Sequence, residues 1–327
     1  MTALDLIMTL LETPEWLPFQ YDAAADRVDW LRMTEADYRA AAFLDQRVLR
    51  PDSEFRQSPW PAMPADARRD ADYIFHIGNV GSTLISRLLG ELPTVFALRE
   101  PLLLRTAAEG QFDTLAALLS RTFRPEQRAM VKATSFTSEI ADRMVRRGAR
   151  ALFLYAAPDH YLENILAGEN SWQTLQALSA TRLARLQGRC AGLEVDVASM
   201  HDGLKAALGW ACEMTSLDAA AAKLPAEAVL WMDFDVFLAD PARHLAAIAG
   251  HFGHPAAGAE AICSGPLMRR YSKALEYEYS PQLRREILAD ARRRHAGAIA
   301  DALNWLGGLE SRYPAVAQAI RRARGEA

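Results

Sequence analysis

Residues 73–101 read YIFHIGNVGSTLISRLLGELPTVFALREP, and they combine three features with which a chain can hold a phosphate or sulfonate group. A short apolar run ends at His76, a turn with Gly78 and Gly81 follows, and helical spacing of apolar residues begins near Ser82. Glycines let the backbone turn tightly with its N–H groups inward, and a helix N-terminus adds partial positive charge. This order predicts an anion-binding turn between a strand and a helix, although no lysine or arginine stands in the turn.

The turn differs from the Walker A sequence GxxxxGK[ST], in which a lysine reaches the terminal phosphates. Ser82 follows Gly81 directly, and no glycine occupies the first position of that motif. ATP hydrolysis is therefore not expected. The hydroxyl groups of Ser82 and Thr83 have two compatible interpretations, as donors to a bound anion or as caps of the following helix.

Apolar runs of strand length alternate with helical segments through much of the chain. The runs are DYIFHIG, TVFAL, AMVKAT, ARALFLYA and VLWMDFD. Strands separated by helices predict a parallel sheet with crossover connections. The predicted fold class is α/β, with three layers around a parallel sheet, a P-loop-like strand-turn-helix and extra helices.

Other parts of the chain lie outside this alternation. Residues 1–70 are expected to form an N-terminal extension of short helices and turns, ending in a proline-rich connector. Residues 71–327 are expected to form the α/β domain, with a helical insertion at about 161–223. Two helices are expected near the C-terminus, at roughly 280–306 and 310–324.

Composition and charge limit the classes of function. The chain has 327 residues and a net charge of −4, whereas a protein that binds nucleic acid through its phosphates needs a basic balance. Its three cysteines are far apart and indicate neither a disulfide framework nor a metal site. No apolar run is long enough to span a bilayer, and the N-terminal MTALDLIMTLLETPEW lacks the pattern of a signal peptide. A cytoplasmic protein without a membrane or nucleic-acid partner is expected.

FHIGNVGSTLISRLL followed by LREP resembles the loop with which the sulfotransferase family grips the 5′-phosphosulfate of PAPS. The resemblance continues through VKATSFTSEIADRMVRRGARALFLYAAPDHYLENIL and MDFDVFLADPARHLAAIAGHFG to MRRYSKALEYEYSP. With FLDQR added, the motifs are similar to those of a group of proteobacterial sulfotransferase-like proteins. The resemblance covers about residues 72–306 and implies PAPS as co-substrate and a hydroxyl of a small molecule or peptide as acceptor.

The resemblance also implies roles for individual residues. Glu100 would take the proton of the acceptor, Lys132 would stabilise charge on the transferred sulfonate, and Ser272 would contact the same region. The residues expected to bind the nucleotide are Gly78, Asn79, Gly81, Ser82, Thr83, Arg269, Arg270 and Lys273. Sulfonyl transfer needs a base, cations or N–H donors and in-line positioning, so no metal is expected.

Three positions depart from the family pattern. Asn79 stands where the loop cation is expected, and Ala156 and Asn164 replace the arginine and serine that hold the 3′-phosphate. We expect Lys132 and residues 269–273 to supply the missing positive charge. Two alternatives stay open: another nucleotide-dependent group transferase on the same fold, or a catalytically silent binding protein.

The candidates also have structural interpretations. Glu100 can pair with Arg99 or Arg105, or help to cap the next helix. A lysine such as Lys132 at an otherwise apolar strand end needs either a partner or a function. His76 lies beside the turn, where it is a candidate base, but a hydrogen-bonded core histidine is the commoner arrangement.

Overall fold

The structure, a computed structural model, describes residues 3–145 and 148–326. Its centre is a parallel sheet with the strand order β5-β6-β4-β7-β8. The strands are β4 Asp72–His76, β5 Val95–Arg99, β6 Arg128–Lys132, β7 Ala151–Tyr155 and β8 Val229–Asp233. Each coincides with one of the apolar runs in the sequence, so the prediction of a parallel α/β sheet is confirmed.

The register of the sheet determines which side chains meet at its carboxyl edge. β4 lies in the middle and pairs with β6 on one side and β7 on the other. Arg99, the last residue of β5, lies opposite Lys132, the last residue of β6. Every residue of β4, β5 and β7 is buried, which is why these strands read as continuous apolar runs. The residues that follow the strand ends are thereby gathered at one edge, where parallel α/β sheets bind ligands.

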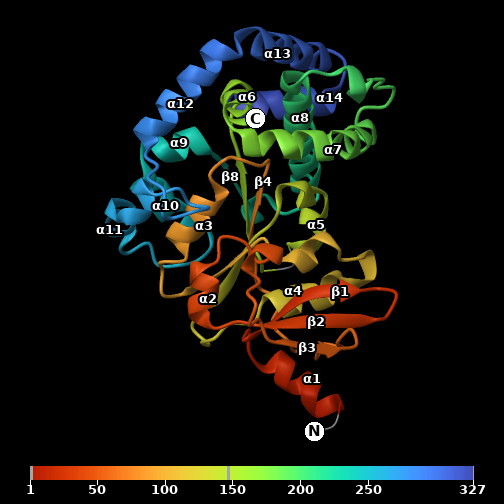
Figure 1. Ribbon diagram of the computed structural model, residues 1–327, viewed down its shortest axis with the longest axis vertical. Helices are drawn as coiled ribbons and strands as arrows, with labels where there is room; N and C mark the ends of the chain where they lie inside the picture. The colour runs from red at the N-terminus through yellow and green to blue at the C-terminus, as the bar shows by residue number, and fades with distance from the viewer. Residues whose placement is uncertain (1–2, 146–147, 327) are drawn as a thin grey trace.

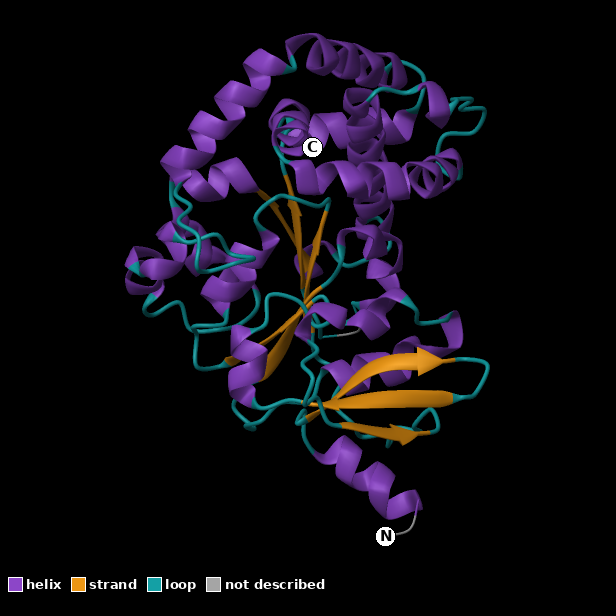
Figure 2. Ribbon diagram, in the orientation of Figure 1, coloured by secondary structure: helices purple, strands orange, loops and turns teal. Residues whose placement is uncertain are grey.

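Helices cover both faces of this sheet and complete three layers (Figure 2). On one face, α3 (Ser82–Leu89) packs against β4, β5 and β6, and α10 (Pro241–His251) packs against α3. On the other face, the short 3₁₀ helix Ser135–Ile140 packs against β4 and against α8 (Asp202–Ala221). The remaining helices of this part of the chain are α4 Phe112–Leu119, α5 Ala141–Met144, α9 Phe234–Ala239 and α11 Ala259–Ser264.

A helical region lies beyond the carboxyl edge of the sheet (Figure 1). Its elements are α6 Pro158–Ala167, α7 Glu169–Gln187, α8, α12 Pro281–Arg294, α13 Ala296–Glu310 and α14 Pro314–Ala323. The largely buried α8 packs against α6, α7, α13 and α14. Of the two predicted C-terminal helices, the second corresponds to α14, whereas the first is divided at His295 into α12 and α13. Gly297 lies two residues beyond this break and is the local signal that could have predicted it.

The N-terminal part is a second, smaller sheet, whereas the sequence favoured short helices and turns. After α1 (Ala3–Glu12), the strands β1 Trp16–Asp22, β2 Arg27–Arg32 and β3 Phe55–Ser58 form an antiparallel sheet, and α2 is Glu35–Ala40. Pro18 within β1 and the alanines between β1 and β2 weakened the strand signal, and the pairing has an irregularity between Pro18 and Gln20. Trp30 is fully buried and donates from its indole nitrogen to Ser58 Oγ at 2.9 Å. The prediction for the secondary structure of residues 1–70 is therefore wrong.

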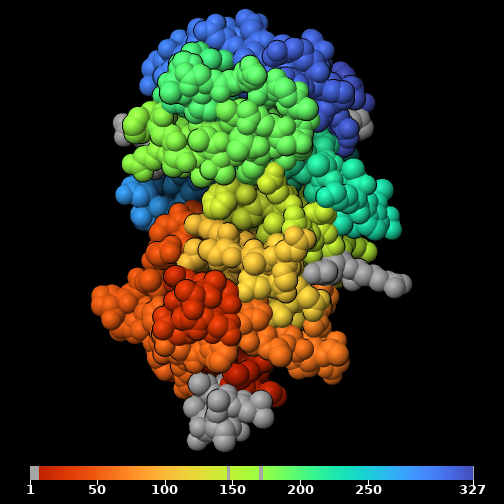
Figure 3. Space-filling view, turned by 90° about the vertical axis from the view of Figure 1, so that its right-hand side faces the viewer, coloured from red at the N-terminus to blue at the C-terminus, as the bar shows by residue number. Residues whose placement is uncertain are grey.

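The first and last helices, α1 and α14, lie toward opposite ends of the molecule (Figure 1). Figure 3 shows the N-terminal residues at one end and the helices of residues 160–220 with the C-terminal helices at the other. Within the described ranges, none of the helices is both long and apolar enough to cross a membrane.

Candidate functional site

A cavity of about 960 Å³ opens at the carboxyl edge of the parallel sheet. Its walls come from the turn after β4, the segments after β5 and β6, helices α6, α7, α9 and α12, and the loop at 265–280, here called the late loop. Among the described lining residues, six cationic side chains and one carboxylate face it: Arg47, Arg105, Lys132, Arg270, Lys273, Arg284 and Glu100. A cleft with this balance of charge attracts anions.

The turn after β4 contains three residues in the left-handed backbone region: Gly78 with φ 92°, Asn79 with φ 52° and Gly81 with φ 70°. The ring of Phe234 lies directly against Gly81, where a Cβ atom would come within 1.9 Å of it. Glycine is therefore required at position 81 by both backbone and space.

Unpaired donors at the start of α3 face the cavity. Among the described residues, the backbone N–H groups of Ser82, Thr83 and Leu84 meet no protein acceptor, as expected for the first turn of a helix. The hydroxyl groups of Ser82 and Thr83 likewise make no hydrogen bond in that part of the chain, although both residues are largely buried and line the cavity. Neither hydroxyl caps the helix, because Gly81 is the N-cap. Amides and hydroxyls free in this way can bind an anion.

Glu100 and Lys132 meet at the edge of the sheet. The Lys132 ammonium group, which is fully buried at the end of β6, donates to Glu100 Oε1. Glu100 has φ 52°, a strained value for a residue with a side chain, and its N–H donates to the carbonyl of Lys132 at 2.7 Å. Its second oxygen accepts from Arg105 Nη2 at 3.3 Å and lies 3.8 Å from Arg47 Nη2. The ion pair with Arg105 that the sequence suggested is present, and Lys132 is added to it.

Opposing effects act on the ionisation of this pair. Burial by itself raises the pKa of Glu100, but the neighbouring positive charges, that of Lys132 first, together with the hydrogen bond from Lys132 outweigh burial, so the pKa lies below its usual value. Burial also lowers the pKa of Lys132, and Glu100 opposes that change. Glu100 is therefore a carboxylate at neutral pH, able to accept a proton.

His76 supports the turn. Gly78 N–H donates to His76 Nδ1 at 3.1 Å, and His76 Nε2 lies 2.9 Å from the carbonyl of Ala133, to which it donates. Burial, and after it the charge of Lys132, lowers the pKa of His76 to about 3. With both ring nitrogens engaged and the ring neutral, His76 has the arrangement of a hydrogen-bonded core histidine.

The late loop brings a cation to the turn. Lys273 Nζ donates to Asn79 Oδ1 at 3.2 Å, at the loop position where the family resemblance expects a cation. Burial lowers the pKa of the Lys273 ammonium group, although the side chain keeps contact with the solvent in the cavity. Ser272 and Arg270 also line the cavity, whereas Arg269 is not among its lining residues. The structure thus gathers all the sequence-predicted site residues except Arg269 around one space.

The two positions associated with the 3′-phosphate have other tasks. Ala156 is buried, and its carbonyl accepts from the indole nitrogen of Trp210 at 3.0 Å. The side-chain amide of Asn164 donates to the carbonyl of Asn79 and so holds the turn. Arg284, which also lines the cavity, is engaged by Asp235. Arg270 and Lys273 are the lining cations that have only neutral hydrogen-bond partners among the described residues.

Sequence reasoning gave no role to Phe43 or Arg47, and it considered Arg105 only as an ion-pair partner of Glu100. Phe43 and Arg47 come from the N-terminal part, and Arg105 follows β5. Asp45, which is 3% exposed, accepts from Arg47 Nε at 2.8 Å and from Arg105 Nη2 at 2.9 Å. The motif FLDQR, residues 43–47, was the one signal in the sequence that could have located this group.

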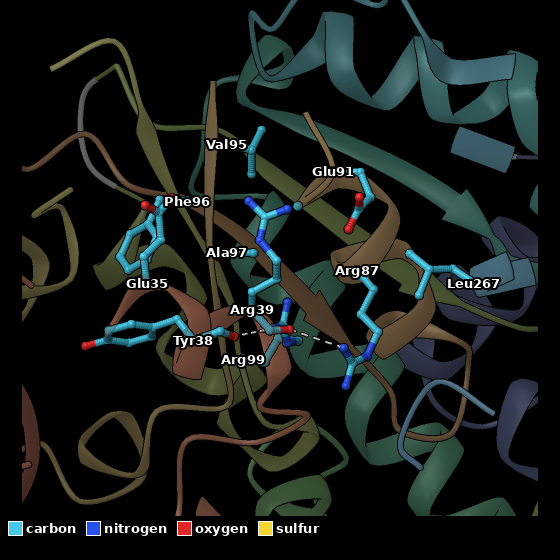
Figure 4. Close-up of a pocket in the computed structure, with 11 residues that line it drawn as sticks. Glu35, Tyr38, Arg39, Arg87, Glu91, Val95, Phe96, Ala97, Arg99 and Leu267 are labelled. Carbon is cyan, nitrogen blue, oxygen red and sulfur yellow. Dashed lines mark hydrogen bonds between the residues drawn. The ribbon is translucent and has the colours of Figure 1, made fainter. Parts of the chain in front are cut away.

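Two buried arginines fasten the N-terminal part to the sheet beside a small cavity of about 40 Å³ (Figure 4). Arg99 donates to the carbonyls of Ala41 at 2.7 Å and Arg39 at 3.0 Å. Arg87, on α3, donates to the carbonyl of Ala40 at 3.1 Å and to that of Ser272 at 2.8 Å. Neither guanidinium forms an ion pair within the described ranges, and burial lowers the pKa of Arg99 to about 9. Arg87 thereby links the helix of the anion-binding turn to the late loop.

The described residues contain no group of three or more His, Cys, Asp or Glu side chains that could hold a metal ion. The cavity itself can hold an anion by amides, hydroxyls and cations beside a buried carboxylate–ammonium pair.

Comparisons with known proteins find solved structures of similar fold. The chain matches no family model and no curated protein. Among solved structures it is similar to the sulfotransferase domain from the curacin biosynthetic pathway, with 13% identity, a TM-score of 0.41 and coverage of 64% of this chain and 83% of that one. It is also similar to a sulfotransferase from Mycobacterium avium, with 13% identity, a TM-score of 0.41 and coverage of 70% and 77%.

A mouse sulfotransferase complexed with PAP is a third similar structure, with 13% identity, a TM-score of 0.36 and coverage of 71% and 88%. All three are sulfotransferases, the family that the sequence motifs resemble. At these TM-scores the likeness carries no argument about the activity of this chain. The function has to be inferred from its own residues.

Proposed function

We propose that the chain is a sulfotransferase that moves a sulfonate from PAPS to a hydroxyl group of a small molecule. The observation that carries the proposal is the convergence of three elements on one cavity. These are the amides and hydroxyls at the start of α3, Lys273 beside Asn79, and the pair Glu100–Lys132. A phosphate–sulfonate donor needs the first two, and an acceptor hydroxyl needs the base in the third.

The residues present fit the phosphosulfate end of PAPS. The first amides of α3 and the hydroxyls of Ser82 and Thr83 offer donors without a protein partner among the described residues, and Lys273 adds a positive charge whose hydrogen-bond partner is neutral. The fit is poorer for the 3′-phosphate, because Ala156 is buried and offers no cation. Arg270, which lines the cavity and makes one long bond to the carbonyl of Glu276 at 3.4 Å, is the residue that would bind that group.

PAPS, when bound, supplies a sulfonate on a phosphate leaving group. Glu100 accepts the proton of the acceptor hydroxyl as the new bond between oxygen and sulfur forms. Protonation neutralises Glu100 and leaves the buried Lys132 ammonium group without its counter-charge. Lys132 then stabilises the negative charge that develops on the leaving oxygen as the bond between sulfur and that oxygen breaks. The hydrogen bonds from Lys132 and Arg105 hold the carboxylate in place for this exchange.

One observation favours a second candidate, a group transferase whose nucleotide donor has no 3′-phosphate. Ala156 is buried and its carbonyl is used by Trp210, so this side of the cavity has no cation at that position. A donor such as adenosine 5′-phosphosulfate would use the same turn and the same pair Glu100–Lys132 without needing Arg270.

The test is a transfer assay with a panel of small hydroxyl compounds and either PAPS or adenosine 5′-phosphosulfate as donor. Chromatography follows the conversion of each donor to its desulfonated nucleotide and of the acceptor to its sulfate ester. We expect conversion of PAPS that is lost in Glu100→Gln and reduced in Arg270→Gln. Turnover of adenosine 5′-phosphosulfate alone, unaffected by Arg270→Gln, selects the second candidate. The absence of turnover with both donors contradicts both.

A further inference from the structure

The side chains that line the cavity beside Glu100 differ from those at the anion-binding turn. An acceptor hydroxyl has to reach the Glu100 carboxylate, so the body of the acceptor lies among the side chains around that residue. These are Phe43 and Arg47 from the N-terminal part, Arg105 after β5 and Phe136 after β6. They are joined to Glu100 and to each other by ion pairs and ring contacts, whereas the anion-binding turn contacts Lys273, Asn164 and Phe234.

Positive charge exceeds negative charge at this end. Three cations, Arg47, Arg105 and Lys132, face the two carboxylates Asp45 and Glu100. Asp45 is already shared by both arginines, and Lys132 and Arg105 share Glu100. The group is therefore left with one positive charge that a ligand can neutralise.

Arg47 is the most exposed of these three cations and has capacity left for that ligand. Its side chain is 54% exposed, and its Nη1 atom has no partner in the described part of the chain. It is also held in place, because Nε and Nη2 bind Asp45 and the guanidinium lies 3.4 Å from the centre of the Phe43 ring. A guanidinium fixed in this way loses little entropy when it binds a carboxylate.

Two aromatic rings border the same space. Phe43 and Phe136 both line the cavity and are only partly buried, and each lies under a guanidinium, that of Arg47 and that of Arg105. Both rings give this end of the cavity an apolar surface, which suits a flat apolar body.

We propose that the acceptor is a hydroxylated aromatic carboxylate, whose ring packs against the apolar surface that Phe43 and Phe136 contribute and whose carboxylate binds Arg47. The inference rests on the proposed function, because the acceptor hydroxyl is placed by its need to reach Glu100. It assigns to the N-terminal part, through Arg47, the choice of substrate.

The test uses matched pairs of compounds: 4-hydroxybenzoate, 4-hydroxyphenylacetate and 3-(4-hydroxyphenyl)propanoate, each beside its methyl ester. Each is titrated calorimetrically into the full chain saturated with adenosine 3′,5′-bisphosphate. A charge-assisted hydrogen bond to Arg47 predicts that at least one acid binds about tenfold more tightly than its ester. Arg47→Gln is expected to abolish that preference, and Arg47→Lys to keep part of it.

Arg50→Gln is the matched control. It removes the same charge three residues further along the same segment, where Arg50 is 60% exposed and pairs with Asp37 outside the cavity. We expect the preference for the acid to be unchanged in this variant. Melting curves of all variants show whether any loss arises from unfolding.

The outcomes separate the two proposals. If the bisphosphate binds but acids and esters bind equally, or none of them binds, the acceptor inference is overturned and the proposed function stands. An acid preference that survives Arg47→Gln also overturns the inference. If the bisphosphate does not bind at all, the proposed function fails, and the acceptor inference that rests on it fails with it.

Discussion

Lys132 and Lys273 line the same cavity but differ in burial and in the charge of their partners. Lys132 is fully buried at the end of β6 and is paired with the Glu100 carboxylate. Lys273 lies on the late loop, keeps contact with solvent and has the neutral amide oxygen of Asn79 as its partner. Burial lowers the pKa of both. The difference indicates a division of tasks, in which the paired lysine belongs to the reacting group and the lysine with a neutral partner belongs to ligand binding.

Removal of the paired lysine should have the largest effect. Lys132→Met keeps much of the volume but leaves Glu100 buried with Arg105 alone as a direct donor. Breaking a buried ion pair costs about 3 kcal/mol. Urea unfolding of this variant should show that loss, whereas Lys273→Met should change the free energy of unfolding by less than about 1 kcal/mol. Equal losses in the two variants would contradict the division.

The next largest effect of the Glu100–Lys132 ion pair should be on how the free energy of unfolding changes at acid pH. The pKa of Glu100 is lower in the folded than in the unfolded protein, so unfolding takes up a proton and acid favours it. The stability from Glu100 is present above its ordinary pKa of 4.5 and is lost as the pH falls through the lowered value. Glu100→Gln should therefore flatten the loss of stability below about pH 4.5, measured by urea unfolding at several pH values. An unchanged acid limb would mean that the pair does not form.

Lys273→Ala should affect binding with little effect on stability. The substitution removes from the anion-binding turn a cation that has only a neutral hydrogen-bond partner. A charge-assisted hydrogen bond to a ligand accounts for about tenfold in affinity. The affinity for adenosine 3′,5′-bisphosphate should fall by about that factor, and its dependence on salt should become shallower. Affinity that is the same in this variant and the wild type would place the ligand elsewhere.

The smallest expected effect concerns the anchor of the late loop. Arg87→Gln removes the donor to the Ser272 carbonyl, so Lys273 should lose its position and the affinity for the bisphosphate should fall about threefold. Arg121→Gln is the control, because Arg121 also binds backbone carbonyls, those of Leu10 and Trp16 among them, far from the cavity. It should change stability but not affinity.

A positioning role for Arg87 also predicts non-additivity. In the double variant Arg87→Gln with Lys273→Ala, the affinity should match that of Lys273→Ala alone, because Arg87 acts through Lys273. Additive losses would mean that Arg87 affects binding by another route.

The sequence predicted the parts of the fold whose signal is local. The buried strands of the parallel sheet read as apolar runs, and the turn with Gly78 and Gly81 could be recognised because only glycine suits its backbone and spacing. The N-terminal sheet was missed because Pro18 and a run of alanines concealed its alternation. The division of the C-terminal helix at His295 was missed although Gly297 follows it by two residues, because a single glycine inside a helical pattern is a weak signal.

The site was predictable where chain order and strand ends coincide. Glu100 and Lys132 follow neighbouring strands, so their meeting follows from the sheet order. The pairing of Lys273 with Asn79 spans 194 residues, and Arg47 reaches the cavity because the arginines at 87 and 99 hold the backbone of the N-terminal part. Contacts between residues so far apart in the sequence depend on tertiary packing, and no spacing in the sequence predicts them.

The most direct measurement is a calorimetric titration of the wild-type protein with adenosine 3′,5′-bisphosphate, with adenosine as the ligand that lacks both phosphates. If the turn after β4 and Lys273 form an anion site, the bisphosphate binds, adenosine binds at least about tenfold more weakly, and the difference shrinks at high salt. Equal binding of the two ligands, or no binding of the bisphosphate, would contradict the assignment of this cavity to a phosphate–sulfonate donor.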